Sequence, residues 1–364
     1  MRAFLLERRR LIGFIILGVF FALIPLWVQS PYYIDLLIVV MINAALAMTF
    51  VMLLRTGLIS LCVAAFWGIG AYSSAMLSLK AGLSFWACLP LSTIITAIAA
   101  LIIGYVIIRN AGFTFVIMTT VIAMLFVTVV GNIQWLGAYN GVSNIPAPDS
   151  ISFGSLGTIV FDSKVDFFYL GLILFVIIFL VINAFYSSWA GRAWNAIGLN
   201  PRLAQSMGVN VFRYRLISFV LGCAIAGLVG SFYAHYQTFI IPTAFNLFPK
   251  TIYIQVFAVL GGVGFATLGP IVGAGLLSLF SELFSGFEEY SIMIVGALVL
   301  VVVVFLPSGL LSLGGYLSRL WGWLHGGGGG AAQGEAASPG ELTPGPVVAE
   351  PGARPGQAGS GGVS

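Results

Sequence analysis

The chain has 364 residues, of which 60% are apolar and only 7% are charged, and its formal net charge is +4. About a quarter of the residues in a soluble domain are charged, so this composition excludes a globular protein that folds in water. It is typical of a polytopic membrane protein, in which the distribution of the positive residues predicts orientation rather than an anionic partner.

Apolar stretches divide the chain into predicted membrane spans, because a helix needs about 20 apolar residues to cross a bilayer. The first stretch, 11–28, follows four arginines as in a secretory signal, but its length favours a retained span. The eighth, 249–262, is short enough to re-enter the membrane instead of crossing it. We predict an all-α polytopic protein with about ten helical spans, whose ranges are 11–28, 34–54, 61–79, 85–108, 113–131, 166–188, 213–236, 249–262, 268–285 and 290–311.

The positive residues fall on alternate sides of this predicted topology. With both termini inside, the outer segments contain the three lysines, which are Lys80, Lys164 and Lys250. The inner segments contain all the arginines, which are Arg2, Arg8, Arg9, Arg10, Arg55, Arg109, Arg192, Arg202, Arg213, Arg215, Arg319 and Arg354. This distribution satisfies the positive-inside rule and leaves the predicted membrane interior without charge.

Small residues recur at helical spacing in three of the predicted spans. Residues three or four apart share one face of a helix, and small side chains let membrane helices approach closely. We therefore expect these residues at helix contacts or along a translocation path, with broken helices at 261–264 and at Pro270. The members of the three stripes are Ala64, Gly68, Ala71 and Ala75; Gly222, Ala226, Gly230 and Ala234; and Gly269 and Gly273.

The longest inner loop is the polar stretch "GRAWNAIGLNPRLAQSMGVNVFRYR", 191–215, which contains four arginines and no acidic residue. We expect a short helix that begins at Gly191 and is ended by Gly198. A second helix should follow, with Asn200 as its cap and Gly208 as its C-terminal stop.

The second of these helices carries Leu203 and Met207 on one face, because they are four residues apart. At about seven residues it is too short to be stable alone in water. A short helix with an apolar face and basic flanks is typical of a segment that docks into a groove on another protein. The alternative is a helix that lies on anionic lipid headgroups.

Several kinds of chemistry lack their sequence patterns here. The chain contains no G-x-x-x-x-G-K-[ST], so we expect no ATP site of its own. Its cysteines, Cys62, Cys88 and Cys223, are isolated in apolar runs and form no metal-like grouping with His235 or His325. We predict that the chain has no catalytic residue and binds no metal or cofactor. Membrane lipid is an expected partner, and nucleic acid is not. An uncharged interior also disfavours a proton or ion relay, so energy for transport would enter from outside the chain.

Two further segments lie between or after the spans. The outer connection, about 132–165, contains the turn-rich stretch "YNGVSNIPAPDS". The segment 326–364 consists mostly of Gly, Pro, Ala and Ser, and cannot bury enough surface to offset its ordering entropy. We therefore predict a transmembrane domain over 1–325 and a disordered cytoplasmic tail over 326–364.

Four motifs follow one another between Gly57 and Leu277. They are "GLISLCVAAFWGIGAYSSAML", "NGVSNIPAP", "GRAWNAIGLNPRLAQSMGVNVFRYRLISFVLGCAIAGLVGSFYAHY" and "LGGVGFATLGPIVGAGLL". In that order they resemble the early motif, the outer-loop motif, the coupling loop with its following helix, and the late glycine motif of branched-chain amino acid ABC importer permeases of the LivM type. The chain departs from the family pattern at Gln205, where an acidic residue is usual, and at Asn140 and Asn144, where Asp and Gly are usual.

This resemblance implies a permease in a bacterial inner membrane that pairs with a second, related permease and with two cytoplasmic ATPases. A periplasmic binding protein would deliver the substrate, and ATP would be hydrolysed on the ATPases, so the chain is expected to be a transport subunit and not an enzyme. The implied ATPase-coupling residues, within about 190–213, are Gly191, Arg192, Asn200, Leu203, Ala204, Gln205, Met207 and Gly208. The implied docking residues for the binding protein are Asn140, Gly141, Ser143, Asn144 and Pro146.

Alternative functions stay open at this point. Urea, short amides and other amino acids are alternative substrates, because nothing in the predicted spans determines the side chain of the substrate. A secondary transporter is disfavoured by the uncharged interior and by the absence of an inverted repeat of broken helices. A structural or assembly protein of the membrane is the third class.

Overall fold

The computed structural model describes residues 30–110, 112–150, 163–265 and 267–283, together with a few isolated positions such as 151–152 and 158–159. The predicted spans 11–28 and 290–311 lie outside the described residues apart from single positions, and the predicted tail 326–364 lies wholly outside them.

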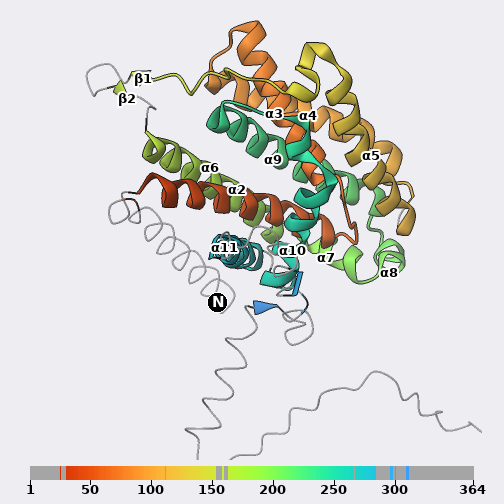
Figure 1. Ribbon diagram of the computed structural model, residues 1–364. Helices are drawn as coiled ribbons and strands as arrows, with labels where there is room; N and C mark the ends of the chain where they lie inside the picture. The colour runs from red at the N-terminus through yellow and green to blue at the C-terminus, as the bar shows by residue number, and fades with distance from the viewer. Residues whose placement is uncertain are drawn as a thin grey trace, which may run out of the picture. The chain divides into compact units, whose positions relative to one another are not determined.

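The described chain is a bundle of membrane-length helices, as Figure 1 shows. Five of them are long and apolar enough to cross a bilayer: α2 (Pro31–Leu54), α4 (Phe85–Ile107), α5 (Phe113–Asn132), α6 (Lys164–Ser187) and α9 (Val211–Gln237). The shorter helices are α3 (Val63–Ala81), α7 (Trp189–Leu199), α8 (Pro201–Ser206), α10 (Ile252–Gly261) and α11 (Leu268–Leu283). Seven predicted spans coincide with helices to within about three residues at each end, which confirms an all-α polytopic fold.

The connections contain little regular structure. The 3₁₀ turns are η1 (Gln134–Leu136), η2 (Ala138–Asn140) and η4 (Pro242–Phe245), and η5 (Leu247–Thr251) is a distorted π-turn. The sequence did not predict the small antiparallel hairpin of β1 (Ile151–Ser152) and β2 (Thr158–Ile159), in which Ile151 pairs with Ile159. It is a two-residue ladder in a loop and leaves the fold class unchanged.

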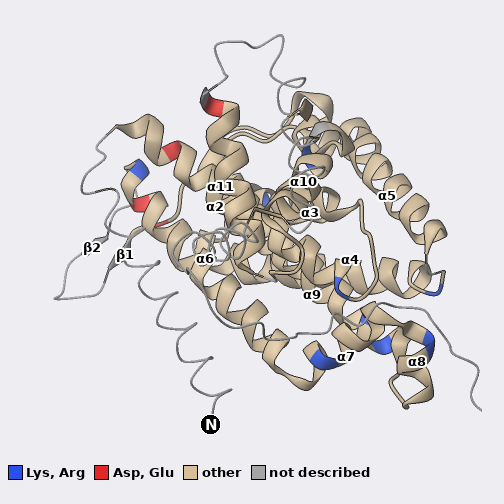
Figure 2. Cartoon of the chain, turned by 90° about the horizontal axis from the view of Figure 1, so that it is seen from below, with Lys and Arg blue, Asp and Glu red and all other residues tan. Residues whose placement is uncertain are grey.

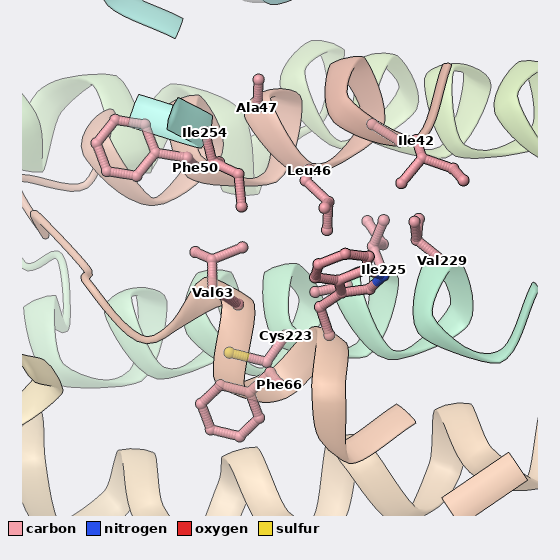
Figure 3. Packing of buried hydrophobic residues seen from close by; sticks show 14 of the residues in the cluster. Ile42, Leu46, Ala47, Phe50, Val63, Phe66, Cys223, Ile225, Val229 and Ile254 are labelled. Atoms are coloured by element: carbon pink, nitrogen blue, oxygen red, sulfur yellow. The ribbon is translucent and has the colours of Figure 1, made fainter. Parts of the chain in front are cut away.

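Helix α2 lies in the centre of the bundle. In its most apolar stretch 83% of the residues are buried, against 28% in α4 and 33% in α5. Figure 3 shows its side chains Leu46 and Phe50 facing residues of α3 and α9, among them Val63 and Ile225. A helix that is apolar all round is expected to be surrounded by other helices, and α4, α5 and α6 are the more exposed of the long apolar helices.

The predicted stripes of small residues are all buried. A Cβ atom at Gly230 would collide with the carbonyl oxygen of Trp67, so the backbones of α3 and α9 are in direct contact there. A Cβ at Gly273 would collide with the carbonyl oxygen of Phe257 in the same way, which brings α10 and α11 together. Glycine is required at both contacts because any side chain would separate the helices.

The two ends of the bundle differ in charge. We call one the basic end, because it holds Arg55 after α2, Arg109 after α4 and the arginines of the α7–α9 segment. In Figure 2 these positive residues gather around α7 and α8. We call the other the loop end. It holds Lys80, the connection 133–150, and Lys164, whose ammonium lies 3.8 Å from the carboxylate of Asp35.

The eighth predicted span is a broken crossing over 238–261. It begins at the loop end, where Ile240 forms a backbone bridge with Val142. It then passes through η4 and η5, in which Phe248 is extended (φ −105°, ψ 130°) as expected for a residue that precedes a proline. Helix α10 completes the crossing, since the carbonyl of Gly264, just beyond it, accepts a hydrogen bond of 3.1 Å from Arg55 at the basic end. The segment therefore crosses the bundle and does not turn back.

Candidate functional site

The polar stretch at the basic end forms two consecutive helices, α7 and α8. The side chain of Ser188 caps α7 by accepting from the backbone N–H of Ala190 at 3.2 Å. The side-chain oxygen of Asn200 caps α8 by accepting from two backbone N–H groups, those of Arg202 and Leu203, each at 3.1 Å. Gly208 follows α8 with φ +84°. The cap at Asn200 and the glycine after the second helix are where the sequence predicted them.

The predicted role of Gly198 is wrong. The first helix begins before Gly191, at Trp189, and continues through Gly198 to Leu199. A Cβ atom at Gly198 would collide with the carbonyl oxygen of Arg55, so this glycine allows α7 to rest directly on the chain that leaves α2. Close approach, and not helix termination, explains the residue.

Helix α7 is fixed to the bundle by a buried tryptophan. Trp194 is fully buried, and its indole N–H donates to the carbonyl oxygen of Tyr214 in α9 at 2.9 Å. Its ring stacks on Phe185 at a centroid distance of 6.0 Å. Gly191 is buried against the backbone of Tyr186, where a Cβ atom would collide. These contacts join α6, α7 and α9 into one unit.

Two arginines bind backbone groups next to this unit. Arg55 donates to the side-chain oxygen of Asn195 at 3.4 Å and to the Gly264 carbonyl, and its guanidinium lies 4.8 Å from the ring centroid of Tyr186. Arg215 is only 7% exposed and donates to the carbonyl of Thr56 at 3.1 Å. Arg215 therefore has a structural role inside the bundle. The other arginines of this segment, Arg192, Arg202 and Arg213, are exposed.

An apolar face is exposed on this fixed unit. Leu199 ends α7, Leu203 lies in α8 and Met207 directly follows α8, and their side chains are 89%, 60% and 80% exposed. We call these three residues the coupling face. Ala204 is buried against the bundle side of α8, and Gln205 is exposed. The sequence singled out Leu203 and Met207 but missed Leu199, because the cap at Asn200 and the proline after it interrupt the helical period.

The loop end carries the predicted docking residues on a connection that is tied to the broken crossing. Asn140, Ser143 and Asn144 are exposed, and Asn144 has φ +61°. Gly141 has φ +78° and no room for a Cβ beside the carbonyl of Ile240. The left-handed conformation of Asn144 and the close approach at Gly141 both position the loop.

A buried polar network holds the end of this loop. The Nδ1 of His235 lies 2.7 Å from the carbonyl oxygen of Pro146, and its Nε2 lies 2.9 Å from the hydroxyl of Ser74. Because a carbonyl only accepts, Nδ1 carries the proton and Nε2 accepts from Ser74. The hydroxyl of Ser231 is 2.7 Å from that of Ser74. The sequence found no role for His235, because its partners are distant in the chain.

The predicted outer position of Lys250 is wrong. This lysine lies in η5, in the middle of the broken crossing, and is partly buried. Its ammonium is 5.7 Å from the ring centroid of Trp67, a residue of α3 that is 1% exposed. The interior of the bundle therefore contains a charged side chain. The apolar run is interrupted at Phe248–Pro249, but the chain does not come to the surface there.

Trp67 connects this position to an aromatic cluster, whose members are Trp67, Tyr72, Phe126, Tyr233 and Phe245. The ring of Phe245 is at the centre, with centroid distances of 4.7 Å to Trp67, 6.0 Å to Tyr72, 6.1 Å to Tyr233 and 6.2 Å to Phe126. The cluster brings α3, α5 and α9 into contact with the irregular half of the broken crossing.

No group of acidic, histidine or cysteine side chains in the described part of the chain could hold a metal ion. Cys62, Cys88 and Cys223 are buried free thiols.

Comparisons with known proteins connect these features to a family. The family model described as "Branched-chain amino acid transport system / permease component" matches residues 32–304. The high-affinity branched-chain amino acid transport system permease protein LivM of Salmonella typhimurium and that of Escherichia coli are each 31% identical over 276 residues. The match covers 71% of this chain and 64% of those relatives, so the chain spans less than two thirds of their length.

A second kind of relative also matches. The probable branched-chain amino acid transport permease protein LivH of Methanocaldococcus jannaschii is 29% identical over 227 residues, which covers 59% of this chain and 68% of that protein. No solved structure matches the chain significantly.

Proposed function

We propose, on the premise that this chain belongs to the family of branched-chain amino acid transport system permease components, that it is the membrane permease subunit of an ATP-driven importer of branched-chain amino acids. The family membership confirms the resemblance found in the sequence. The observation that carries the proposal is the coupling face, three exposed apolar side chains on a helix pair fixed to the bundle by Trp194 and Arg55.

The coupling face is suited to transmit motion from an ATPase. Water is a poor environment for exposed apolar side chains, and a short helix with Leu203 and Met207 on one face can bind through that face in a groove. The buried contacts of α7 join it to α6 and α9. An ATPase that held the coupling face would therefore pull on membrane helices directly.

The remaining subunits and the orientation follow from the same proposal. The basic end faces the cytoplasm, where positive residues are retained, and two ATPases bind there. The loop end faces the periplasm, with Asn140, Ser143 and Asn144 exposed for a substrate-binding protein. A second, related permease completes the path, and relatives named LivM and LivH both match this chain.

Transport by the reconstituted complex tests the proposal. Proteoliposomes would contain this permease, its partner permease and the ATPases, with the binding protein and labelled leucine, isoleucine or valine on the loop-end side. We expect ATP-dependent uptake of these three and slower uptake of urea or short amides. Preferred uptake of urea or an amide would replace the substrate assignment, and uptake that needs an ion gradient instead of ATP would contradict the importer assignment.

A further inference from the structure

Lys250 lies about halfway through the bundle. Helix α10 begins two residues later, at Ile252, and ends at Gly261 beside the basic end. Its ten residues rise about 15 Å, which is half of a hydrocarbon core of about 30 Å. The break at Phe248 and the turn η5 thus set a lysine at the middle of the membrane.

No acidic side chain neutralises this lysine among the described residues. The ion pair found there joins Lys164 to Asp35 at the loop end. A charged residue inside a membrane bundle is costly, and such residues face a cavity or a pathway and have a functional partner. The contact with the ring of Trp67 lowers the cost only in part, because a cation–π contact contributes less than a paired anion.

Hydrogen-bond donors without partners lie in the same region. The described residues include four buried polar side-chain atoms that lack a hydrogen bond, and three of them are the indole nitrogen of Trp67, the hydroxyl of Tyr72 and the hydroxyl of Thr251. Buried groups of this kind are usually satisfied. Trp67 contacts the Lys250 ammonium, Thr251 is its neighbour in the chain and Tyr72 belongs to the same aromatic cluster, so these groups together indicate a missing anionic partner.

An open apolar groove reaches two members of the aromatic cluster. It has a volume of about 620 Å³ and lies between α3, α4 and α5. Lys80 and Trp135 line it at the loop end, and Tyr72 and Phe126 of the aromatic cluster line it farther in. Ligand cavities typically have volumes of about 300–1,000 Å³ with mostly apolar walls and a few polar groups.

We propose that Lys250, with the indole of Trp67 and the hydroxyls of Tyr72 and Thr251, forms a transient binding site for the carboxylate of an amino acid that crosses the bundle. This inference rests on the proposed function, because it assigns the site at which that substrate passes. The ammonium attracts the carboxylate, and the three neutral donors supply hydrogen bonds. The aromatic cluster provides an apolar surface for a branched side chain.

The site also explains why the crossing is broken. A continuous helix would satisfy its own backbone groups, whereas irregular backbone within a membrane is tolerated where it lines a cavity. The extended residue Phe248 redirects the chain two residues before Lys250.

Three lysine variants of the full reconstituted importer test the assignment. Lys250→Met keeps the length of the side chain but removes its charge, Lys250→Arg keeps the charge, and Lys164→Met removes a charge paired outside the site. We expect Lys250→Met to lower leucine uptake about tenfold or more, because a charge-assisted hydrogen bond is lost. Lys250→Arg should retain uptake within about threefold of wild type, and Lys164→Met should be unchanged.

ATP hydrolysis stimulated by the binding protein is the second readout. It should persist in Lys250→Met, since coupling at the basic end is intact, so that the ratio of leucine moved to ATP hydrolysed falls. Uptake by Lys250→Met within about twofold of wild type would overturn the inference. An equal loss in Lys250→Met and Lys250→Arg would also overturn it, because charge would not be the feature that matters.

Further variants cover the case in which Lys250→Met fails to assemble. Trp67→Phe and Tyr72→Phe keep an aromatic ring and remove one donor each, and we expect each to reduce uptake by about threefold to tenfold. Wild-type uptake in both would contradict the inference. Failure of the proposed function gives a different result, in which the wild-type complex itself does not take up leucine.

Discussion

The coupling face exposes apolar side chains, whereas the Lys250 site places a charged side chain inside an apolar bundle. Each region therefore holds side chains in an unfavourable environment, but the chemistry is opposite. At the basic end the arginines Arg55 and Arg215 are engaged by backbone carbonyls, while Leu203 and Met207 are left in water. In the middle of the bundle the apolar groups are well packed. Among the described residues, the Lys250 ammonium there has no ion pair and three buried donors have no hydrogen bond. On the two proposals made above, the exposed apolar surface would bind a protein partner, and the buried lysine would bind a passing ligand.

The first prediction tests the coupling face and has the largest expected effect. Leu203→Asp removes an apolar contact of about 1.5–3 kcal/mol and adds a desolvation cost of several kcal/mol at a docked interface. We expect the ATPase to be lost from the purified complex while the permease stays inserted, because Leu203 lies outside every span.

Arg202→Gln is the matched control on the same helix. An exposed charge contributes about 0–1 kcal/mol, so this variant should retain the ATPase. If α8 lay on lipid headgroups instead, charge loss would matter as much as the apolar face. Co-purification of the ATPase with Leu203→Asp at wild-type levels would refute docking through this face.

The second prediction concerns the contact between α3 and α9, which supports both regions. Gly230→Ala places a Cβ against the carbonyl of Trp67 and should lower the free energy of unfolding by about 1–3 kcal/mol or more. Gly222→Ala lies on the same stripe, but its Cβ would lie 3.2 Å from the flexible end of Met52. Thermal unfolding in detergent should rank Gly230→Ala far below Gly222→Ala, and equal melting temperatures would show that the close contact is unimportant.

The third prediction separates two neighbouring serines and has the smallest effect. Ser74 is bonded to Ser231 and His235 across the α3–α9 contact, whereas Ser73 bonds to Gly70 within its own helix. Ser74→Ala leaves buried partners unsatisfied and should cost about 1–2 kcal/mol, and Ser73→Ala about 0–0.5 kcal/mol. Faster proteolysis of the loop at Pro146 in Ser74→Ala alone would locate the loss. Equal stability of the two variants would argue against the network.

The fold followed from the sequence because span length and hydropathy are local properties. The stripes at Gly230 and Gly273 followed from the same periodicity, since each lies within one regular helix. The path of the broken crossing did not follow, because the depth of Lys250 is set by its contact with Trp67 and by the bridge of Ile240 to Val142. Those partners are far away in the sequence.

The candidate sites show the same limit. The cap at Asn200 and the apolar spacing of Leu203 and Met207 could be predicted, because each involves residues within one or two turns. The role of Gly198 could not, since a glycine that ends a helix and one that admits a neighbouring carbonyl are identical in sequence. Its partner, the carbonyl of Arg55, became visible only in the fold.

Thiol labelling of the coupling face tests the central claim, which is that this face lies in the cytoplasm and is covered by an ATPase. Leu203→Cys would be placed in a chain whose three native cysteines are replaced by alanine, with Lys164→Cys as the loop-end reference. The account predicts that an impermeant reagent labels position 203 only in inverted vesicles, and that bound ATPase protects it there. Labelling of position 203 from the outside of intact cells, or full labelling in inverted vesicles despite bound ATPase, would contradict the account.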